Sequence, residues 1–141
     1  MVALGGPAAH DHTDAIAELV ANFQRVQFEF DAASLSDASK SALSANAAIM
    51  KAHPKLSVEV QGHADERGTT EYNLALGERR AAAVRDYLAN EGISPRRVVT
   101  ISFGEEAPLD RAGTEVAWSA NRRAEFRVLD GAELTVVGTT D

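Results

Sequence analysis

Residues Gly62–Leu88 read GHADERGTTEYNLALGERRAAAVRDYL, a polar loop that leads from an apolar segment into a long predicted helix. Asp65 lies in the loop, and Asn73 and Arg80 follow on the helix. Seven residues are nearly two helical turns, so Asn73 and Arg80 share a helix face, offset by ~20° and separated by ~10 Å of rise. The pattern therefore places a carboxylate just before a helix face that carries an amide and a guanidinium.

The charges of Asp65 and Arg80 suit a zwitterionic ligand. Leu76 and Val84 lie four residues on either side of Arg80, so the arginine leaves the helix on its apolar side. At the edge of a core, Asp65 suits an ammonium group, and Arg80 suits a carboxylate through a two-pronged hydrogen bond. A structural salt bridge between Asp65 and Arg80 is the alternative, and the spacing alone leaves both interpretations open.

The composition is that of one ordinary globular domain and excludes several classes of function. The chain has 141 residues, of which 45% are hydrophobic and 25% charged, enough to bury a core. A net charge of −7 without a basic stripe argues against nucleic-acid binding and against docking on anionic lipid. The chain has no cysteine, which excludes disulfides and thiolate metal sites, and no apolar run approaches the ~20 residues of a membrane span.

Alternating apolar residues predict four strands of one sheet. Because every strand alternates, one face of the sheet is expected to be solvated, with helices covering only the other face. The predicted fold is a two-layer α/β sandwich (α+β in class terms) with the order β-α-β-α-β-β, a mixed sheet and both helices on one face. The apolar faces are expected to consist of Val26, Phe28 and Phe30; Leu56, Val58 and Val60; Val99, Ile101 and Phe103; and Ala124, Phe126 and Val128.

Capping residues set the limits of the two main helices. Ser36 is expected to cap the first, which carries Leu43, Ala47 and Met50 inward and stops before Pro54. Thr69 is expected to cap the second, with Glu71 favourable in its first turn, and Gly92 to end it in a left-handed conformation.

The ends of the chain are predicted to lie outside the main domain. Residues 1–22 are interpreted as a flexible lead-in with a short helix, capped by Asp14 and carrying Ile16, that ends near Asn22. Residues 23–129 form the domain itself. Residues 130–141 form an extension in which Leu134, Val136 and Val137 suit an added edge strand and residues 138–141 are expected to be disordered.

Several motifs, in this order, resemble those of the OmpA-like peptidoglycan-binding domain. The longest is Gly62–Gly68 followed by Tyr72–Ala81. The others are FEFD at Phe28–Asp31, SFGEEAP at Ser102–Pro108 and SANRRA at Ser119–Ala124. Together they cover roughly Arg25 to Val128. The resemblance implies the same two-layer fold.

The resemblance also implies a ligand, meso-diaminopimelate in the peptide stems of peptidoglycan. Asp65 and Arg80 match the family positions that bind its amino and carboxylate ends. Asn73 matches an amide that hydrogen-bonds the ligand, and Leu76 matches an apolar wall. The resemblance adds backbone contacts from three residues at the end of the first strand, namely Phe30, Asp31 and Ala32.

Arg122 and Arg123 are expected to be adjacent in a strand and to face opposite sides of the sheet, so only one of them serves the site. The resemblance favours Arg122. Arg123 is then expected to be solvated or to face a partner.

Within the family, His63–Gly68 (HADERG) is closer to the Pal branch, the peptidoglycan-associated lipoproteins, than to the GHTD variant of porins and flagellar stators. That branch implies a lipid-anchored protein on the periplasmic face of the outer membrane, tethered to peptidoglycan as part of the Tol-Pal system, with TolB as partner. Such lipoproteins carry an acylated cysteine, which this sequence lacks, and Met1–Pro7 has no signal-peptide features. Either the chain is trimmed or the anchor is absent.

Four residues, His63, Asp65, Glu66 and Trp118, allow other interpretations. His63 and Asp65 form a possible metal fragment for a wall hydrolase, but zinc needs three or four ligands, and we expect no metal, no cofactor and no catalysis. A glycosidase mechanism would need a pair of carboxylates, such as Asp65 and Glu66. This interpretation is disfavoured because adjacent loop residues usually point apart. Trp118 is expected to be a core or covering residue, with a partner contact as the alternative.

An OmpA-like anchor without TolB binding is the second functional hypothesis.

Overall fold

The computed structural model describes residues 17, 19–130 and 135–138. Residues 17 and 19–22 are helical. The remaining elements are β1 (Val26–Gln27), α2 (Asp37–Ala52), β2 (Ser57–His63), α3 (Thr70–Asn90), a short 3-10 helix (Pro95–Arg97), β3 (Val98–Gly104), α4 (Glu115–Asn121), β4 (Arg123–Asp130) and β5 (Thr135–Gly138).

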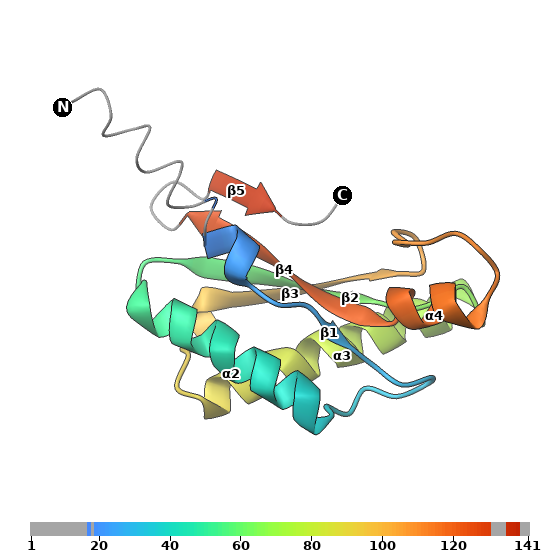
Figure 1. The fold of residues 1–141 in the computed structure, drawn as a ribbon, viewed down its shortest axis with the longest axis horizontal. Coiled ribbons are helices and arrows are strands. Elements are labelled where there is room, and N and C mark those ends of the chain that lie inside the picture. Colours follow the sequence, from blue (N-terminus) through green and yellow to red (C-terminus); the bar gives the residue numbers. More distant parts are fainter. Residues whose placement is uncertain (1–16, 18, 131–134, 139–141) are drawn as a thin grey trace.

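One mixed sheet forms the first layer of the fold. Its strands follow the order β1-β4-β2-β3, and β5 also pairs with β4. β2 and β3 are parallel, whereas β4 is antiparallel to β1, β2 and β5. α2 and α3 lie together on one side of this sheet (Figure 1). The predicted two-layer architecture, with a mixed sheet and both helices on one face, is therefore confirmed.

Both helices begin at the predicted N-cap residues. Ser36 Oγ accepts a hydrogen bond from the Ser39 N–H, and Thr69 Oγ1 accepts one from the Tyr72 N–H. Gly92 ends α3 with φ 98°, and the Ile93 N–H donates to the Leu88 carbonyl at 3.0 Å. Glycine suits this turn because the left-handed region costs it no Cβ clash.

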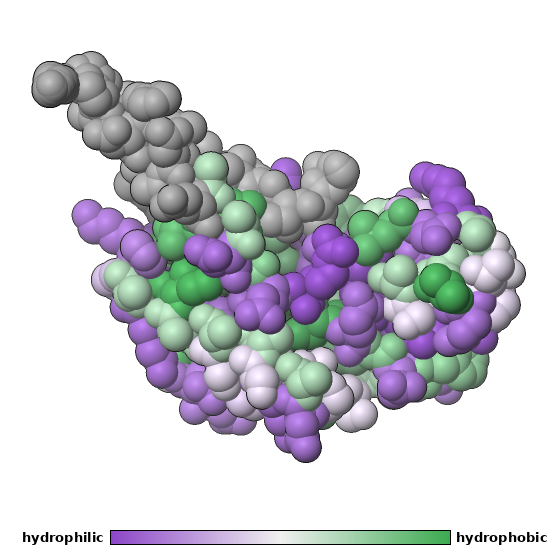
Figure 2. Space-filling view, viewed as in Figure 1, coloured by the Kyte–Doolittle hydropathy of each residue, from purple (hydrophilic) through white to green (hydrophobic). Residues whose placement is uncertain are grey.

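The core lies between the sheet and the two helices. Burying one such apolar side chain contributes about 1.5–3 kcal/mol relative to leaving it exposed. On the face seen in Figure 2, hydrophilic and hydrophobic side chains are interspersed. The main core cluster includes Val26, Phe28, Leu43, Ala47, Met50, Val58, Val60, Ala81, Val84, Leu88, Ala124 and Phe126.

Two glycines allow α3 to pack very close to the sheet. A Cβ on Gly62 would lie 1.7 Å from the Gly77 carbonyl oxygen, and a Cβ on Gly77 would lie 2.1 Å from Ser102 Oγ. Real Cβ atoms do not come this near to another heavy atom, so the two glycines allow the helix to rest directly on the strand.

The first strand is shorter than the strand that the alternation over Arg25–Phe30 predicts. β1 covers only Val26 and Gln27, although the Phe28 N–H still donates to the Arg122 carbonyl at 2.9 Å. Phe30 is 58% exposed and does not join the apolar face, which corrects the predicted alternation. The reason is Asp31, whose φ of 57° turns the chain away from the sheet.

The predicted orientation of β3 is wrong. Val98 pairs with Val58 and Thr100 with Val60, so Val98 and Thr100 share the helix-facing side. Val99 and Ile101 therefore face the opposite side and are 50% and 40% exposed. Alternation alone does not say which face of a strand is inward, and here the pairing with β2 decides it.

The sheet face opposite the helices was predicted to be solvated, but part of it is buried. Gln61, His63, Arg123 and Glu125 are all buried on it. The connection after β3 folds over this face, and Arg123 Nη2 donates to the carbonyl of Ala107 at 2.9 Å. Arg123 is thus neither solvated nor partner-facing, because it pairs with Glu125 at 2.7 Å.

The His63 ring is stacked on Phe103, with ring centroids 5.3 Å apart. Burial, together with the positive charges of Arg123 and Arg25, lowers the pKa of His63 to about 3. Neither ring nitrogen has a hydrogen-bond partner within the described residues. The imidazole is therefore neutral at physiological pH, and its role in this structure is packing.

The connection before β4 contains a helix that was not predicted, α4. Thr114 caps it by accepting from the Ala117 N–H. At the ends of the chain, the helical residues stop at Asn22 as predicted, whereas Asp14 and Ile16 lie outside the described residues.

At the C-terminus, Val136 and Val137 lie in β5, which confirms the predicted added strand at these residues. Gly138 also belongs to β5, so the predicted disorder is wrong at that position, whereas Leu134 and residues 139–141 are outside the described residues. In the described part of the chain, no helix combines the length and the hydropathy that a membrane crossing requires.

Candidate functional site

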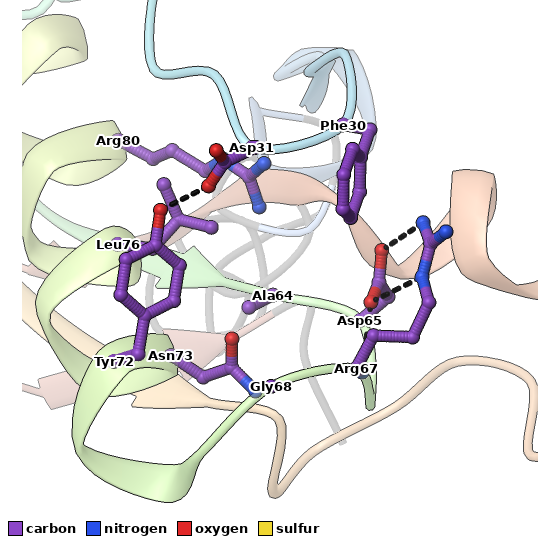
Figure 3. A pocket seen from close by; sticks show the side chains of 10 residues that line it. All are labelled: Phe30, Asp31, Ala64, Asp65, Arg67, Gly68, Tyr72, Asn73, Leu76 and Arg80. Carbon is purple, nitrogen blue, oxygen red and sulfur yellow. Dashed lines mark hydrogen bonds and ion pairs between the residues drawn. The ribbon is translucent and has the colours of Figure 1, made fainter.

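A cavity of about 360 Å³ opens where the end of β2, the start of α3 and the loop after β1 meet. Figure 3 shows Asp65 and Arg67 on one side of it and Arg80, Tyr72 and Asp31 on the other. The residues that line the cavity are Phe30, Asp31, Ala64, Asp65, Arg67, Gly68, Tyr72, Asn73, Leu76 and Arg80.

Arg80 is fully buried and is held by three backbone carbonyls. Its Nε donates to the Ala32 oxygen at 2.8 Å, its Nη1 to His63 at 2.8 Å and its Nη2 to Glu29 at 3.1 Å. A guanidinium has five N–H donors, so two have no acceptor among the described residues. Burial lowers the pKa of Arg80 to about 10, which leaves it charged at neutral pH, and the carboxylate of Asp65 opposes that shift.

Asp65 is only 4% exposed and is held by Arg67. Arg67 donates to it from the backbone N–H (2.9 Å), from Nε (3.1 Å) and from Nη2 (2.8 Å). Burial raises the pKa of Asp65, but these hydrogen bonds and the charges of Arg67 and Arg122 outweigh burial and hold the pKa below its usual value. Asp65 is therefore an ionised carboxylate at neutral pH.

Asp65 and Arg80 do not form a salt bridge with each other within the described structure. The ion pairs of Asp65 are with Arg67 at 2.8 Å and Arg122 at 3.7 Å. The structural-pair interpretation left open by the sequence is therefore not the arrangement that the fold adopts. The cavity presents one negative and one positive group on separate walls.

Asn73 and Leu76 line the cavity from the first turns of α3, as the shared helix face predicts. Asn73 is 1% exposed, and its Nδ2 donates to Glu105 at 2.8 Å. Its side-chain oxygen is turned toward the cavity in Figure 3 and accepts no hydrogen bond from the described residues. Leu76, at 5% exposure, supplies an apolar wall.

Phe30, Asp31 and Ala32 reach the site in different ways. The Phe30 and Asp31 side chains line the cavity, whereas the predicted contribution was mainly from backbone groups. Asp31 accepts a hydrogen bond from the Tyr72 hydroxyl. Ala32 does not line the cavity, and it acts through its carbonyl, which holds Arg80.

Arg67 and Tyr72 were not among the predicted site residues. The Arg67 guanidinium lies 4.1 Å from the ring centroids of both Phe30 and Trp118. Trp118 Nε1 in turn donates to Glu66 at 2.8 Å, so Trp118 covers the loop that holds Asp65. A signal for Arg67 was present in the sequence, since an Asp side chain often bonds the backbone N–H two residues later.

Arg122 is the C-cap of α4 and not a strand residue, which corrects the predicted placement. Its Nε donates to the Phe28 carbonyl at 2.8 Å, and its Nη1 and Nη2 lie 3.7 Å and 3.2 Å from Asp65 and Glu115. It does not line the cavity, and a direct ligand contact stays a prediction. The described residues contain no group of three or more His, Cys, Asp or Glu side chains that could hold a metal ion.

Comparison with known proteins places this site in a family context. Residues 27–122 match the model of the OmpA family. The peptidoglycan-associated lipoprotein of Brucella melitensis biotype 1 is 46% identical over 108 residues, 77% of this chain and 64% of the relative. That of Haemophilus influenzae is 44% identical over 109 residues, 77% of this chain and 71% of the relative.

Solved structures agree with this similarity. The crystal structure of the peptidoglycan-associated lipoprotein from Burkholderia pseudomallei has a TM-score of 0.71 and 41% identity, and the match covers 73% of this chain and 87% of that one. The C-terminal domain of Helicobacter pylori MotB, at 20% identity and a TM-score of 0.71 over 78% of this chain and 87% of that one, shares the fold alone.

The family match spans well over half of the chain, and the Brucella relative is 46% identical over 77% of it. The chain covers 64% of the length of that relative. Taken with the mixed sheet and the cavity at the end of β2, these matches show that the chain belongs to the OmpA family.

Proposed function

We propose that this domain is a non-catalytic module that binds peptidoglycan through the meso-diaminopimelate of its peptide stems. The observation that carries the proposal is the pair of opposite charges on separate walls of one cavity, Asp65 and Arg80. The ammonium group of the ligand approaches the Asp65 carboxylate, and its carboxylate takes the two N–H donors of Arg80 that have no acceptor among the described residues.

The surrounding residues suit the rest of such a ligand. The Asn73 oxygen is an acceptor for a stem amide, and Leu76 covers the aliphatic chain. Burial of Arg80 favours affinity because the guanidinium is already fixed by three carbonyls and loses little freedom on binding. Such binding needs no nucleophile or base, and we infer no catalysis.

The relatives support the cellular role. Their name, peptidoglycan-associated lipoprotein, couples association with the wall to lipid attachment. We therefore propose that the full protein tethers the outer membrane to peptidoglycan from the periplasmic side. TolB is the proposed protein partner, and an OmpA-like anchor without TolB binding is the second candidate function.

Retention on purified sacculi tests the proposal. Asp65→Asn leaves the ligand ammonium without its charge partner, at a cost of about 2–5 kcal/mol. Arg80→Lys keeps the positive charge but cannot form the two-pronged hydrogen bond to the ligand carboxylate, so both variants should lose retention. Asp86→Asn and Arg79→Lys make the same two exchanges at exposed positions of α3 and serve as matched controls that should bind normally. Wild-type retention by a folded Asp65→Asn or Arg80→Lys variant would remove the assignment.

A further inference from the structure

We propose that two copies of this domain associate edge to edge through β3, forming a symmetric dimer with one continuous sheet. β3 is the last strand of the path β1-β4-β2-β3, and β2 is its only partner within the described residues. Its outer row of backbone N–H and C=O groups is therefore available for a further strand.

Over Val98–Ser102, where the pairing with β2 is regular, the edge carries none of the usual features that prevent strand pairing. β3 is seven residues long, VVTISFG, with no proline and no charged side chain. Its register irregularity lies at the far end, where the pairing shifts between Gly62 and His63. Val99 and Ile101 are 50% and 40% exposed on this edge strand. Both residue types favour the interior of a sheet, where a strand is paired on each side. A second strand beside them would bury both side chains in cross-strand contacts.

A groove of about 410 Å³ runs along the other face of this edge, between α3 and β3. Glu78, Ala82 and Arg85 line it from the helix, and they share one helix face because they are spaced by four and three residues. Glu78 follows Gly77, which contacts Ser102 near the end of β3. Since α3 connects two parallel strands, it runs opposite to β3, and Arg85 lies toward the start of the strand.

This arrangement is complementary to itself. When two β3 edges pair antiparallel about a twofold axis, the two α3 helices also run antiparallel on the same face of the joined sheet. Glu78 of one copy then faces Arg85 of the other, whose Nε also bonds Asp86 of its own helix at 3.3 Å. Ala82 faces Ala82, and the symmetry repeats the Glu78–Arg85 pair. A second copy of this chain is therefore the occupant that the charges fit.

Sedimentation equilibrium over a concentration series tests the proposal, with circular dichroism to verify folding. The wild-type domain should dimerise reversibly. Glu78→Arg places like charges opposite each other twice and should weaken the dimer by roughly tenfold. The double variant Glu78→Arg/Arg85→Glu should restore the wild-type constant, and Ile101→Lys on the edge should abolish the dimer.

A wild-type domain that stays monomeric up to about 1 mM would overturn the proposal. So would a dimer that Glu78→Arg leaves unchanged, or a double variant that is no tighter than Glu78→Arg alone. Glu78 and Ile101 do not line the cavity with Asp65, so the variants should keep sacculus binding. Failure of the dimer is therefore separable from failure of peptidoglycan binding.

Discussion

Asp65 and Arg80 line one cavity from separate walls, and each is held by groups other than its counterpart. Arg67 binds Asp65 through three hydrogen bonds, whereas three backbone carbonyls hold Arg80. Both charges are thus positioned before a ligand arrives. Because they do not neutralise each other, a ligand with an ammonium and a carboxylate does not need to break a salt bridge between them.

Arg67 is predicted to set the pKa of Asp65. In Arg67→Ala the two side-chain hydrogen bonds are lost while burial remains, so the pKa of Asp65 should rise. In the wild type the pKa is depressed, and the resulting stability is present above the unfolded value of about 3.9 and is lost as pH falls through the folded pKa. NMR titration of the carboxyl carbon measures the shift.

Arg111→Ala is the matched control for Arg67, because Arg111 is exposed and forms no ion pair with a described residue. It should leave the titration of Asp65 unchanged. An Asp65 pKa that is equal in wild type and Arg67→Ala would mean that Arg67 does not hold the carboxylate.

His63 is predicted to make the domain sensitive to acid. Its pKa is about 3 when folded and about 6.5 when unfolded, so the unfolded state binds the proton first. Stability should therefore fall by about 2–3 kcal/mol as pH decreases over the first two units below 6.5. His63→Phe keeps the stack on Phe103 and removes the titration, so urea denaturation should show a flatter pH profile.

His53→Gln removes an exposed histidine and should keep the pH profile of the wild type. A His63→Phe variant with the wild-type slope would assign the acid sensitivity to other groups.

Removal of the Arg80 side chain is predicted to destabilise the domain as well as to abolish binding. Arg80→Ala leaves the carbonyls of Glu29, Ala32 and His63 without this donor, at a cost of about 3–5 kcal/mol. Thermal unfolding should shift down by roughly 10 °C. Arg79→Ala, on the exposed face of the same helix, should shift it little, and equal melting points for the two variants would contradict this role for the buried side chain.

The predicted TolB interaction has its own test. We expect TolB to contact the mouth of the cavity, where the rings of Phe30 and Trp118 enclose the Arg67 guanidinium. Two ligands that use one mouth must compete, so excess muropeptide should weaken TolB binding. A competition titration measures this. TolB binding no tighter than that of an unrelated control protein would favour the second candidate function.

The sequence predicted the helix caps, the turn after α3 and the helix face of the site, because these features depend on residues that are close together in the chain. The caps at Ser36 and Thr69 and the turn at Gly92 follow from short-range hydrogen bonds and backbone conformation. The shared face of Asn73, Leu76 and Arg80 follows from helical spacing, and all three residues line the cavity.

The features that the sequence did not predict depend on contacts between distant segments. Pairing with β2 turns Val99 and Ile101 outward, although their alternation is regular. The connection after β3 folds back and buries Arg123 with Glu125, a pair that looks solvated in the sequence. Arg67 was not predicted because its two aromatic neighbours, Phe30 and Trp118, are distant from it in the sequence on either side.

Calorimetric titration with three stem peptides tests the central claim most directly. The peptides carry diaminopimelate, diaminopimelate amidated at its side-chain carboxylate, or lysine. We predict tight binding of the first peptide and a loss of roughly tenfold or more for the other two, because the free N–H donors of Arg80 then have no carboxylate to bind. Equal affinities for the three peptides would contradict the assignment of Arg80 as the carboxylate site.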